Sequence, residues 1–263
     1  MTVAQIDVFL SEVSKNSKNQ VARMLKVSEK FLGAAFSNSP LGEGPGSQPD
    51  PDPLIRFDSV DCTTLIEQTL ALSQSVNLKE AMELLRRIRY IDGEIGYVTR
   101  KHFMMAQWIP LNQQLGLLED ITREIGGNKV KLVKKRLNTV VWKKRNKKKA
   151  WPLLKPDQIP QGQFHLPIIL IDEAPKYVNQ IPAGTILNVV RRDYRSMPVR
   201  ITHQGLVIVK NKRRYLRHAA RAGYRRVVDE LLLTFLRRNK AYSKWPVDGI
   251  NLQRVTMIGG KQK

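Results

Sequence analysis

The chain has 263 residues, of which 42% are hydrophobic, enough for one large domain or two small ones. A single cysteine excludes an intramolecular disulfide, and no Cys/His set has zinc-ligand spacing, so we expect no metal or other cofactor. The formal charge of +22 favours an acidic partner, which could be nucleic acid, an anionic membrane or an anionic wall polymer.

The N-terminal part reads as helical. Apolar spacing predicts one helix from Val3 to Val13 and another from about Asn19 to Leu32. The stretch from Ser37 to Pro53 is rich in Pro, Gly, Ser and Asp, which predicts an exposed loop. A third helix is expected to begin around Cys62, because Thr64 and Glu67 have the spacing of a capping box ahead of an apolar stripe.

The middle of the chain mixes helix and turn signals. A helix is predicted from Leu78 to Arg89, with Asn77 as its cap. Asp92-Gly93 is a hairpin turn signal between two short apolar segments. The segment from Phe103 to Leu118 is expected to be partly helical and broken at Pro110.

Strands dominate the later part of the chain. A hairpin is predicted across Asn211-Lys212, and an amphipathic helix from Val228 to Arg238. Helices first and strands later predict the α+β class. The expected strands run from Lys129 to Val141, Ile168 to Ile171, Thr185 to Val190, Ile201 to Val209, Tyr215 to Ala219 and, at a sheet edge, Ile250 to Met257.

Cys62 is the first candidate for chemistry. A thiol in the first turn of a helix faces unpaired backbone N–H groups and the positive end of the helix dipole, and both favour the thiolate. The alternative is that this cysteine is a small buried hydrophobic residue.

A nucleophilic cysteine needs a base, usually a histidine oriented by a third polar group. His203 lies near the start of one hairpin strand and His218 near the end of the next, so the hairpin places both at the same end of the sheet. The alternatives are a chance histidine pair, or a metal site, for which a third ligand is missing.

Several motifs occur in a characteristic order. They are Phe31-Leu32-Gly33, Asp61-Cys62-Thr63-Thr64, Arg89-Tyr90-Ile91-Asp92-Gly93, Arg100-Lys101-His102, Trp108, Ile181-Pro182-Ala183-Gly184, His203-Gln204-Gly205-Leu206-Val207 and Leu216-Arg217-His218-Ala219. In this order they resemble the NlpC-type cell-wall cysteine hydrolases, which are papain-like, and most closely their N-acetylmuramoyl-L-alanine amidase-like branch. One departure is Ala35-Phe36, where the superfamily often has Pro-Tyr, so the tyrosine hydroxyl is missing.

The resemblance implies a papain-like fold in which a helix bearing the nucleophile packs on an antiparallel sheet that carries the histidines. Cys62 would be the nucleophile, His203 the base and His218 the group that orients it. Residues 1–263 would form a single catalytic domain, with N-terminal helices at 1–32, a catalytic core at 60–236 and a basic insertion or loop at 129–151. The residues expected to contact substrate are Asp61, Arg100, His102 and Trp108.

The substrate implied by the resemblance is a peptidoglycan fragment, or muropeptide. The bond would be the amide between N-acetylmuramic acid and L-alanine or, alternatively, the D-glutamyl–diamino-acid bond that the wider superfamily commonly cuts. The implied place is the periplasm or another extracytoplasmic compartment of a bacterium. The N-terminus lacks the pattern of a signal peptide, so we expect either a leader that has been removed or a cytosolic protein.

The segment Lys143 to Lys149 carries six basic residues in seven and is flanked by Trp142 and Trp151. It could be a solvated loop, a phosphate-binding site whose tryptophans stack on bases, or an anchor to an anionic wall or membrane surface. The rival interpretation of the whole chain is therefore a non-enzymatic basic protein that binds nucleic acid or an anionic surface, with Cys62 merely buried.

Overall fold

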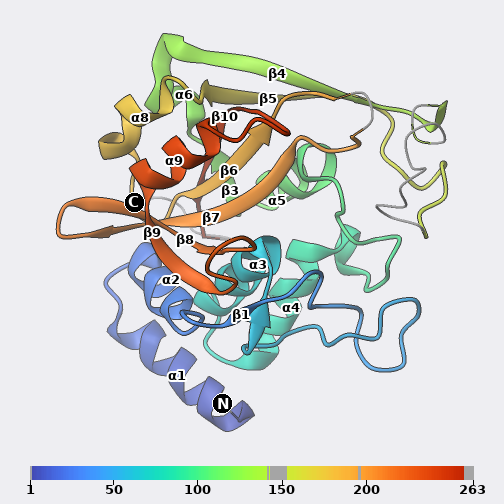
Figure 1. The fold of residues 1–263 in the computed structure, drawn as a ribbon. Coiled ribbons are helices and arrows are strands. Elements are labelled where there is room, and N and C mark those ends of the chain that lie inside the picture. The colour runs from blue at the N-terminus through green and yellow to red at the C-terminus, as the bar shows by residue number, and fades with distance from the viewer. Residues whose placement is uncertain (1, 141, 143–152, 195–196, 258–263) are drawn as a thin grey trace.

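The computed structural model describes residues 2–140, 142, 153–194 and 197–257. It combines helices with one large antiparallel sheet, as the composition of predicted elements indicated (Figure 1). None of the helices in the described ranges is long and apolar enough to cross a membrane.

Within residues 2–90 the chain forms four α-helices, and all four were predicted. Thr2, Asn19 and Asn77 cap three of them by accepting backbone N–H groups, as short polar residues at helix starts do. The helices are α1 (Val3–Asn16), α2 (Gln20–Glu29), α3 (Cys62–Ser73) and α4 (Leu78–Arg89).

Between α2 and α3 the chain forms the predicted loop. Two short strands of two residues each, β1 (Ala35–Phe36) and β2 (Ser59–Val60), pair in parallel and hold the two ends of this loop together. The hairpin expected at Asp92-Gly93 is wrong, because the residues before the turn belong to α4 and only a short 3₁₀ turn, η1 (Ile91–Gly93), follows. A single bridge between Tyr90 and Arg100 is all the strand pairing there.

The break expected at Pro110 is also wrong. A π-helical turn, η2 (Met104–Trp108), continues directly into α5 (Ile109–Gln114). Pro110 lies in the first turn of α5, where a missing N–H group is tolerated.

The large sheet has eight strands in the order β4-β5-β10-β6-β7-β8-β9, with β3 paired to β10. The strand expected at the edge from Ile250 to Met257 instead lies in the centre as part of β10, between β5 and β6. The helix expected from Val228 to Arg238 begins only at Leu232, because the residues before it form an edge strand that pairs with β8. The strands are β3 (Leu118–Asp120), β4 (Val130–Leu137), β5 (Gly162–Leu170), β6 (Ile186–Arg191), β7 (Ile201–Lys210), β8 (Arg213–Ala219), β9 (Val227–Leu231) and β10 (Val247–Val255).

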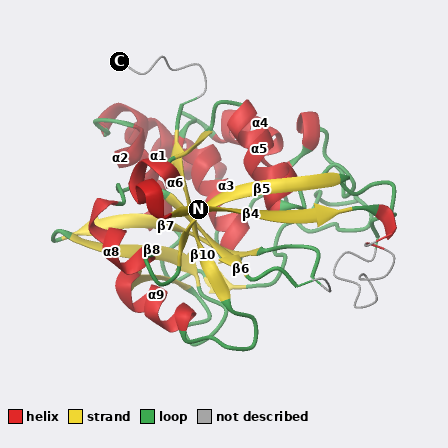
Figure 2. Cartoon of the chain, turned by 90° about the horizontal axis from the view of Figure 1, so that it is seen from above, coloured by secondary structure: helices red, strands yellow, loops and turns green. Residues whose placement is uncertain are grey.

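Helices cover both faces of this sheet (Figure 2). Alternate residues of β7 enter two different cores: Leu206 and Ile208 pack with Ile66 of α3, whereas Val207 packs with Phe235 of α9. The α9 side also holds short helices. These are α6 (Thr122–Gly126), η3 (Gly127–Lys129), α8 (Ala174–Tyr177) and η5 (Val178–Gln180), ahead of α9 (Leu232–Lys240).

Gly205 keeps the β7–β8 hairpin tightly packed. A Cβ atom at this position would lie 2.6 Å from Cγ of Leu216, a buried side chain of β8. We predict that Gly205→Ala lowers the free energy of unfolding by about 1–3 kcal/mol, the usual cost of overpacking. Urea denaturation measures this loss.

The double variant Gly205→Ala/Leu216→Ala provides the control. Removing the Leu216 side chain gives the new methyl group space, so the double variant should lose less stability than the sum of the two single losses. Additive losses would contradict the steric explanation.

Candidate active site

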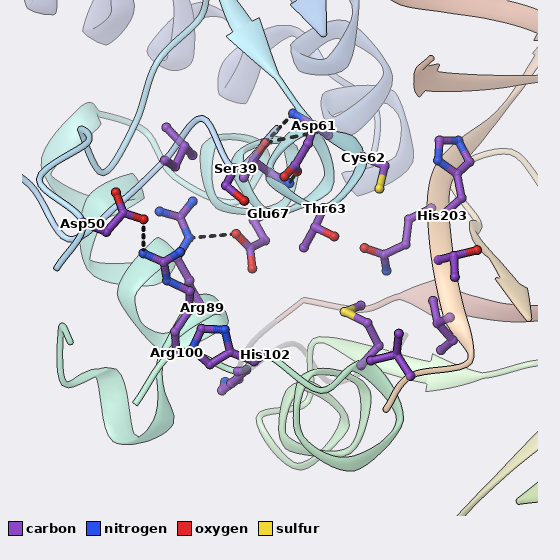
Figure 3. A pocket seen from close by; sticks show the side chains of 18 of the residues that line it. Ser39, Asp50, Asp61, Cys62, Thr63, Glu67, Arg89, Arg100, His102 and His203 are labelled. Atoms are coloured by element: carbon purple, nitrogen blue, oxygen red, sulfur yellow. Dashed lines mark hydrogen bonds and ion pairs between the residues drawn. The ribbon is translucent and has the colours of Figure 1, made fainter. Parts of the chain in front are cut away.

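A cavity of about 360 Å³ opens between the start of α3 and strand β7. Figure 3 shows Cys62 on the helix and His203 on the strand at one end of this cavity, and Arg100 and His102 at the other. Although 141 residues separate Cys62 from His203 in the chain, the fold brings both to one site. Five of the seven site residues that the sequence indicated line the cavity, namely Asp61, Cys62, Arg100, His102 and His203.

Asp61 fixes the start of the cysteine helix. Its carboxylate accepts the Thr64 N–H at 2.7 Å, and the Thr64 hydroxyl accepts the Asp61 N–H at 2.9 Å. The capping box is therefore Asp61 with Thr64, and the prediction of Thr64 with Glu67 is wrong by one turn. Cys62 becomes the first residue of the helix, with its side chain at the cavity wall.

The two histidines lie at the same end of the sheet, as the hairpin geometry predicted, and they are hydrogen-bonded. Nε2 of His203 lies 2.8 Å from Nδ1 of His218, and the two rings meet edge to face. His218 is 2% exposed, and both rings pack against Phe235 of α9. His218 therefore lies behind His203 rather than in the cavity.

Glu230 is the third member of the hydrogen-bonded series that begins with His203 and His218, and the sequence analysis did not predict its role. Its Oε2 accepts from Nε2 of His218 at 3.2 Å, and Arg238 donates to both of its oxygens. Burial raises the pKa of Glu230, but the hydrogen bonds from His218 and Arg238 outweigh this and bring it to about 2. The only sequence signal was an acidic residue in an apolar segment, which became meaningful once β9 paired with β8.

Arg100 and His102 line the cavity, but neither offers it a free positive charge. Arg100 donates to Glu43 and, at 2.9 Å, to Asp50, so its charge is matched by two carboxylates of the loop between α2 and α3. His102 donates from Nε2 to the Tyr97 carbonyl at 2.6 Å, and burial lowers its pKa to about 4. Both residues are placed where they could contact a substrate, as expected, but without an unmatched positive charge for an anionic group.

Trp108 does not reach the cavity. It is fully buried, and its indole N–H donates to Glu67 at 2.9 Å. Arg89 donates to the same carboxylate at 2.8 Å. The prediction that Trp108 contacts substrate is corrected by this burial, because the side chain supports the cysteine helix from beneath.

Across the described ranges, no group of three or more His, Cys, Asp or Glu side chains could hold a metal ion.

Comparison with known proteins places these residues in a family. The profile of the N-acetylmuramoyl-L-alanine amidase-like family matches residues 26–243, which include the cysteine helix, both histidines and Glu230. The chain belongs to this family. No curated protein sequence matches it.

Solved structures share the fold of this amidase-like chain. A Legionella pneumophila protein is 24% identical, with a TM-score of 0.84, 96% of this chain covered and 94% of that one. An N-acetylmuramoyl-L-alanine amidase from Bacteroides uniformis is 22% identical, with a TM-score of 0.69 and coverages of 90% and 99%. A Bacteroides fragilis protein described as a xylanase is 23% identical, with a TM-score of 0.67 and coverages of 88% and 99%. At these identities the likeness concerns the fold alone.

Burial dominates the electrostatics of this amidase-like site. Burial first, and then the nearby Asp61 carboxylate, raise the pKa of Cys62 to about 12, although hydrogen bonds with Gln204 and Thr63 pull the other way. The expectation that the helix start favours the thiolate is therefore wrong for the resting site. Burial first, and then the neighbouring His218, Arg238 and Arg191, lower the pKa of His203 to about 3. The resting pair is a thiol beside a neutral imidazole.

Alkylation of Cys62 tests this resting state. Because only the thiolate reacts and its fraction grows with pH until the pKa is reached, the iodoacetamide rate should rise about tenfold per pH unit from pH 6 to 9. N-acetylcysteine, reacted in parallel, should level off near its own, lower pKa. A plateau for the protein below pH 8 would show a preformed thiolate instead.

Proposed function

We propose that this chain is a cysteine-dependent amidase that cleaves the bond between N-acetylmuramic acid and L-alanine in peptidoglycan fragments. The observation that carries the proposal is one cavity with Cys62 at a helix start and His203 beside it, in a chain of the amidase-like family. The same arrangement supports a papain-like, NlpC-type fold. We also propose that the chain forms one catalytic domain and acts outside the cytoplasm.

The direction of the hydrogen bonds supports His203 as the base. Glu230 is ionised and can only accept, so Nε2 of His218 carries a proton. When His218 is uncharged, its Nδ1 carries no proton and accepts, and Nε2 of His203 donates to it. This leaves the lone pair of His203 on Nδ1, a nitrogen with no hydrogen bond to any residue in the described ranges.

The reaction then runs in two steps. The Cys62 thiol gives its proton to Nδ1 of His203 as the sulfur attacks the amide carbonyl, and that proton passes to the departing amine nitrogen. A thioester remains on Cys62. Water, deprotonated by His203, hydrolyses the thioester and restores the thiol. The backbone N–H of Cys62, at the start of α3, supplies one donor to the oxyanion.

Two other functions remain as outcomes of the test. The first is the D-glutamyl–diamino-acid endopeptidase activity, which uses the same thiol and base. The second is binding of nucleic acid or an anionic wall or membrane surface through Lys143–Lys149, a segment that lies outside the described residues. Trp142, expected to stack on bases in that case, is instead buried against Phe103.

Mass spectrometry of purified muropeptides separates these functions. Wild-type protein should release the intact stem peptide and leave the bare disaccharide, while Cys62→Ala releases nothing. A product that keeps L-Ala–D-Glu on the sugar would indicate the endopeptidase. No cleavage by folded wild-type protein would overturn the proposal.

Glu230 supplies a second prediction, because it sets the tautomers of both histidines. In Glu230→Ala we expect kcat to fall about 10²- to 10⁴-fold with little change in KM, as when an orienting carboxylate is lost. The ¹⁵N NMR shifts of the imidazoles should show loss of the Nε2–H form of His203.

Asp229→Asn is the matched control for Glu230→Ala. Asp229 is the preceding residue of β9. Its carboxylate accepts hydrogen bonds from Arg217 and Lys210 and is not part of the hydrogen-bonded series His203–His218–Glu230. This variant should lose stability but keep kcat. An equal loss of kcat in both variants would show that Glu230 has only a structural role.

A further inference from the structure

A second cavity, of about 450 Å³, opens on the other side of His203. Thr202 and His203 line both cavities, whereas His218 lines only the second and Cys62 only the first. The second cavity therefore adjoins the base without including the nucleophile. Its walls come from the end of β6, the turn after β8, α9 and the segment before β10.

Three arginines line this second cavity, and its lining includes no carboxylate. Arg238 is half exposed and is paired with Glu230 beneath the surface. Arg191 is held by neutral acceptors, the Thr202 hydroxyl at 3.0 Å and the Trp245 carbonyl at 2.6 Å. The Arg221 side chain has no hydrogen bond or ion pair to any residue within the described ranges.

The first cavity has the opposite character. Arg89 is paired with Glu67, and Arg100 with Glu43 and Asp50. The third basic side chain of its lining, Lys101, is buried and donates to the Arg87 carbonyl, and burial lowers its pKa to about 8. Two positive charges, on Arg191 and Arg221, are left unmatched in the second cavity. An anionic part of a ligand is therefore expected in the second cavity and not in the first.

The order of bond breaking indicates which part of the substrate would occupy the second cavity. His203 protonates the departing amine, so the leaving group must lie within hydrogen-bonding reach of His203. The acyl part, bound to Cys62, stays in the first cavity. If the proposed amide is cut, the leaving group is a stem peptide beginning L-Ala–D-Glu, and such a peptide carries free carboxylates.

We propose that a carboxylate of the leaving peptide binds in the second cavity between Arg221 and Arg191. This assignment rests on the proposed amidase function and adds the place and chemistry of leaving-group recognition. The Arg191 guanidinium stacks on the Tyr242 ring, and the distance from Cζ of Arg191 to the ring centroid is 4.9 Å. Arg191 is therefore fixed in place before substrate arrives.

Carboxylate binding there would also strengthen the base. The positive charges of Arg238 and Arg191 are among the causes that keep the pKa of His203 low. A carboxylate beside them offsets that effect and makes His203 a better proton acceptor when substrate is present. The same contact that holds the leaving group thus helps Cys62 lose its proton.

Arg221→Gln tests the assignment with two substrates: a disaccharide that carries L-Ala–D-Glu, and the same compound with its peptide carboxylates amidated. For the acidic substrate, we expect the variant to lower kcat/KM about tenfold or more, the scale of one charged hydrogen bond. For the amidated substrate, wild type and variant should be alike. Arg213→Gln, at an exposed position on the β7–β8 hairpin, should match wild type on both.

Calorimetry with free L-Ala–D-Glu separates this proposal from the amidase function. The dipeptide should bind wild-type protein and Arg213→Gln equally, and at least tenfold more weakly to Arg221→Gln. Equal binding to all three, or no binding to any, would overturn the assignment even if muropeptides are cleaved. Wild-type protein that cleaves neither substrate would overturn the amidase proposal, and the dipeptide titration would still decide the role of Arg221.

Discussion

The buried carboxylate of Glu67 is the constraint on which the site depends. It lies in α3, five residues after Cys62, and accepts hydrogen bonds from Arg89 at the end of α4 and from Trp108 in the π-helical turn. Arg89 also donates to the Leu54 carbonyl in the loop that leads back to α3. Glu67 and Arg89 thus tie four segments together beneath Cys62.

Burying such an ion pair costs desolvation energy, so its value lies in specificity more than in net stability. Each member of the cluster has few alternative partners, and a register shift of α3 would leave Glu67 and Arg89 unpaired in the core. The cluster therefore holds the start of α3 in one place relative to β7. That placement lets Cys62 and His203 share a cavity.

Local signals predicted the parts of the fold that local contacts determine. The cap and bounds of α4, the start of α3 at Cys62 and the β7–β8 hairpin follow from short-range hydrogen bonds and apolar periodicity. The hairpin was enough to predict that His203 and His218 lie at the same end of the sheet, because the position of the turn fixes which ends of the two strands are neighbours.

Long-range pairing decided the parts that could not be predicted. Val227–Leu231 has the apolar residues of a helix start, yet β8 offers it a free edge and it becomes a strand. The segment around Ile250 looked like an edge strand, but β5, β6 and β3 all pair with β10. Nothing local to Glu230 points to His218. Its role depends on the β8–β9 register, which turns an isolated acid into the acceptor at the end of a histidine relay.

In the proposed mechanism, the electrostatics of the two cavities account for the reactivity of a resting thiol of high pKa. Burial keeps both Cys62 and His203 uncharged at neutral pH, which protects the thiol but makes proton transfer between them unfavourable. Arg238 belongs both to the end of the relay, through Glu230, and to the wall of the second cavity. In our proposal, a carboxylate bound between Arg221 and Arg191 offsets the positive charges that keep the pKa of His203 low. The basicity of the site and the occupancy of its leaving-group cavity are then coupled, so the proton moves most readily when a substrate with the right charge is in place.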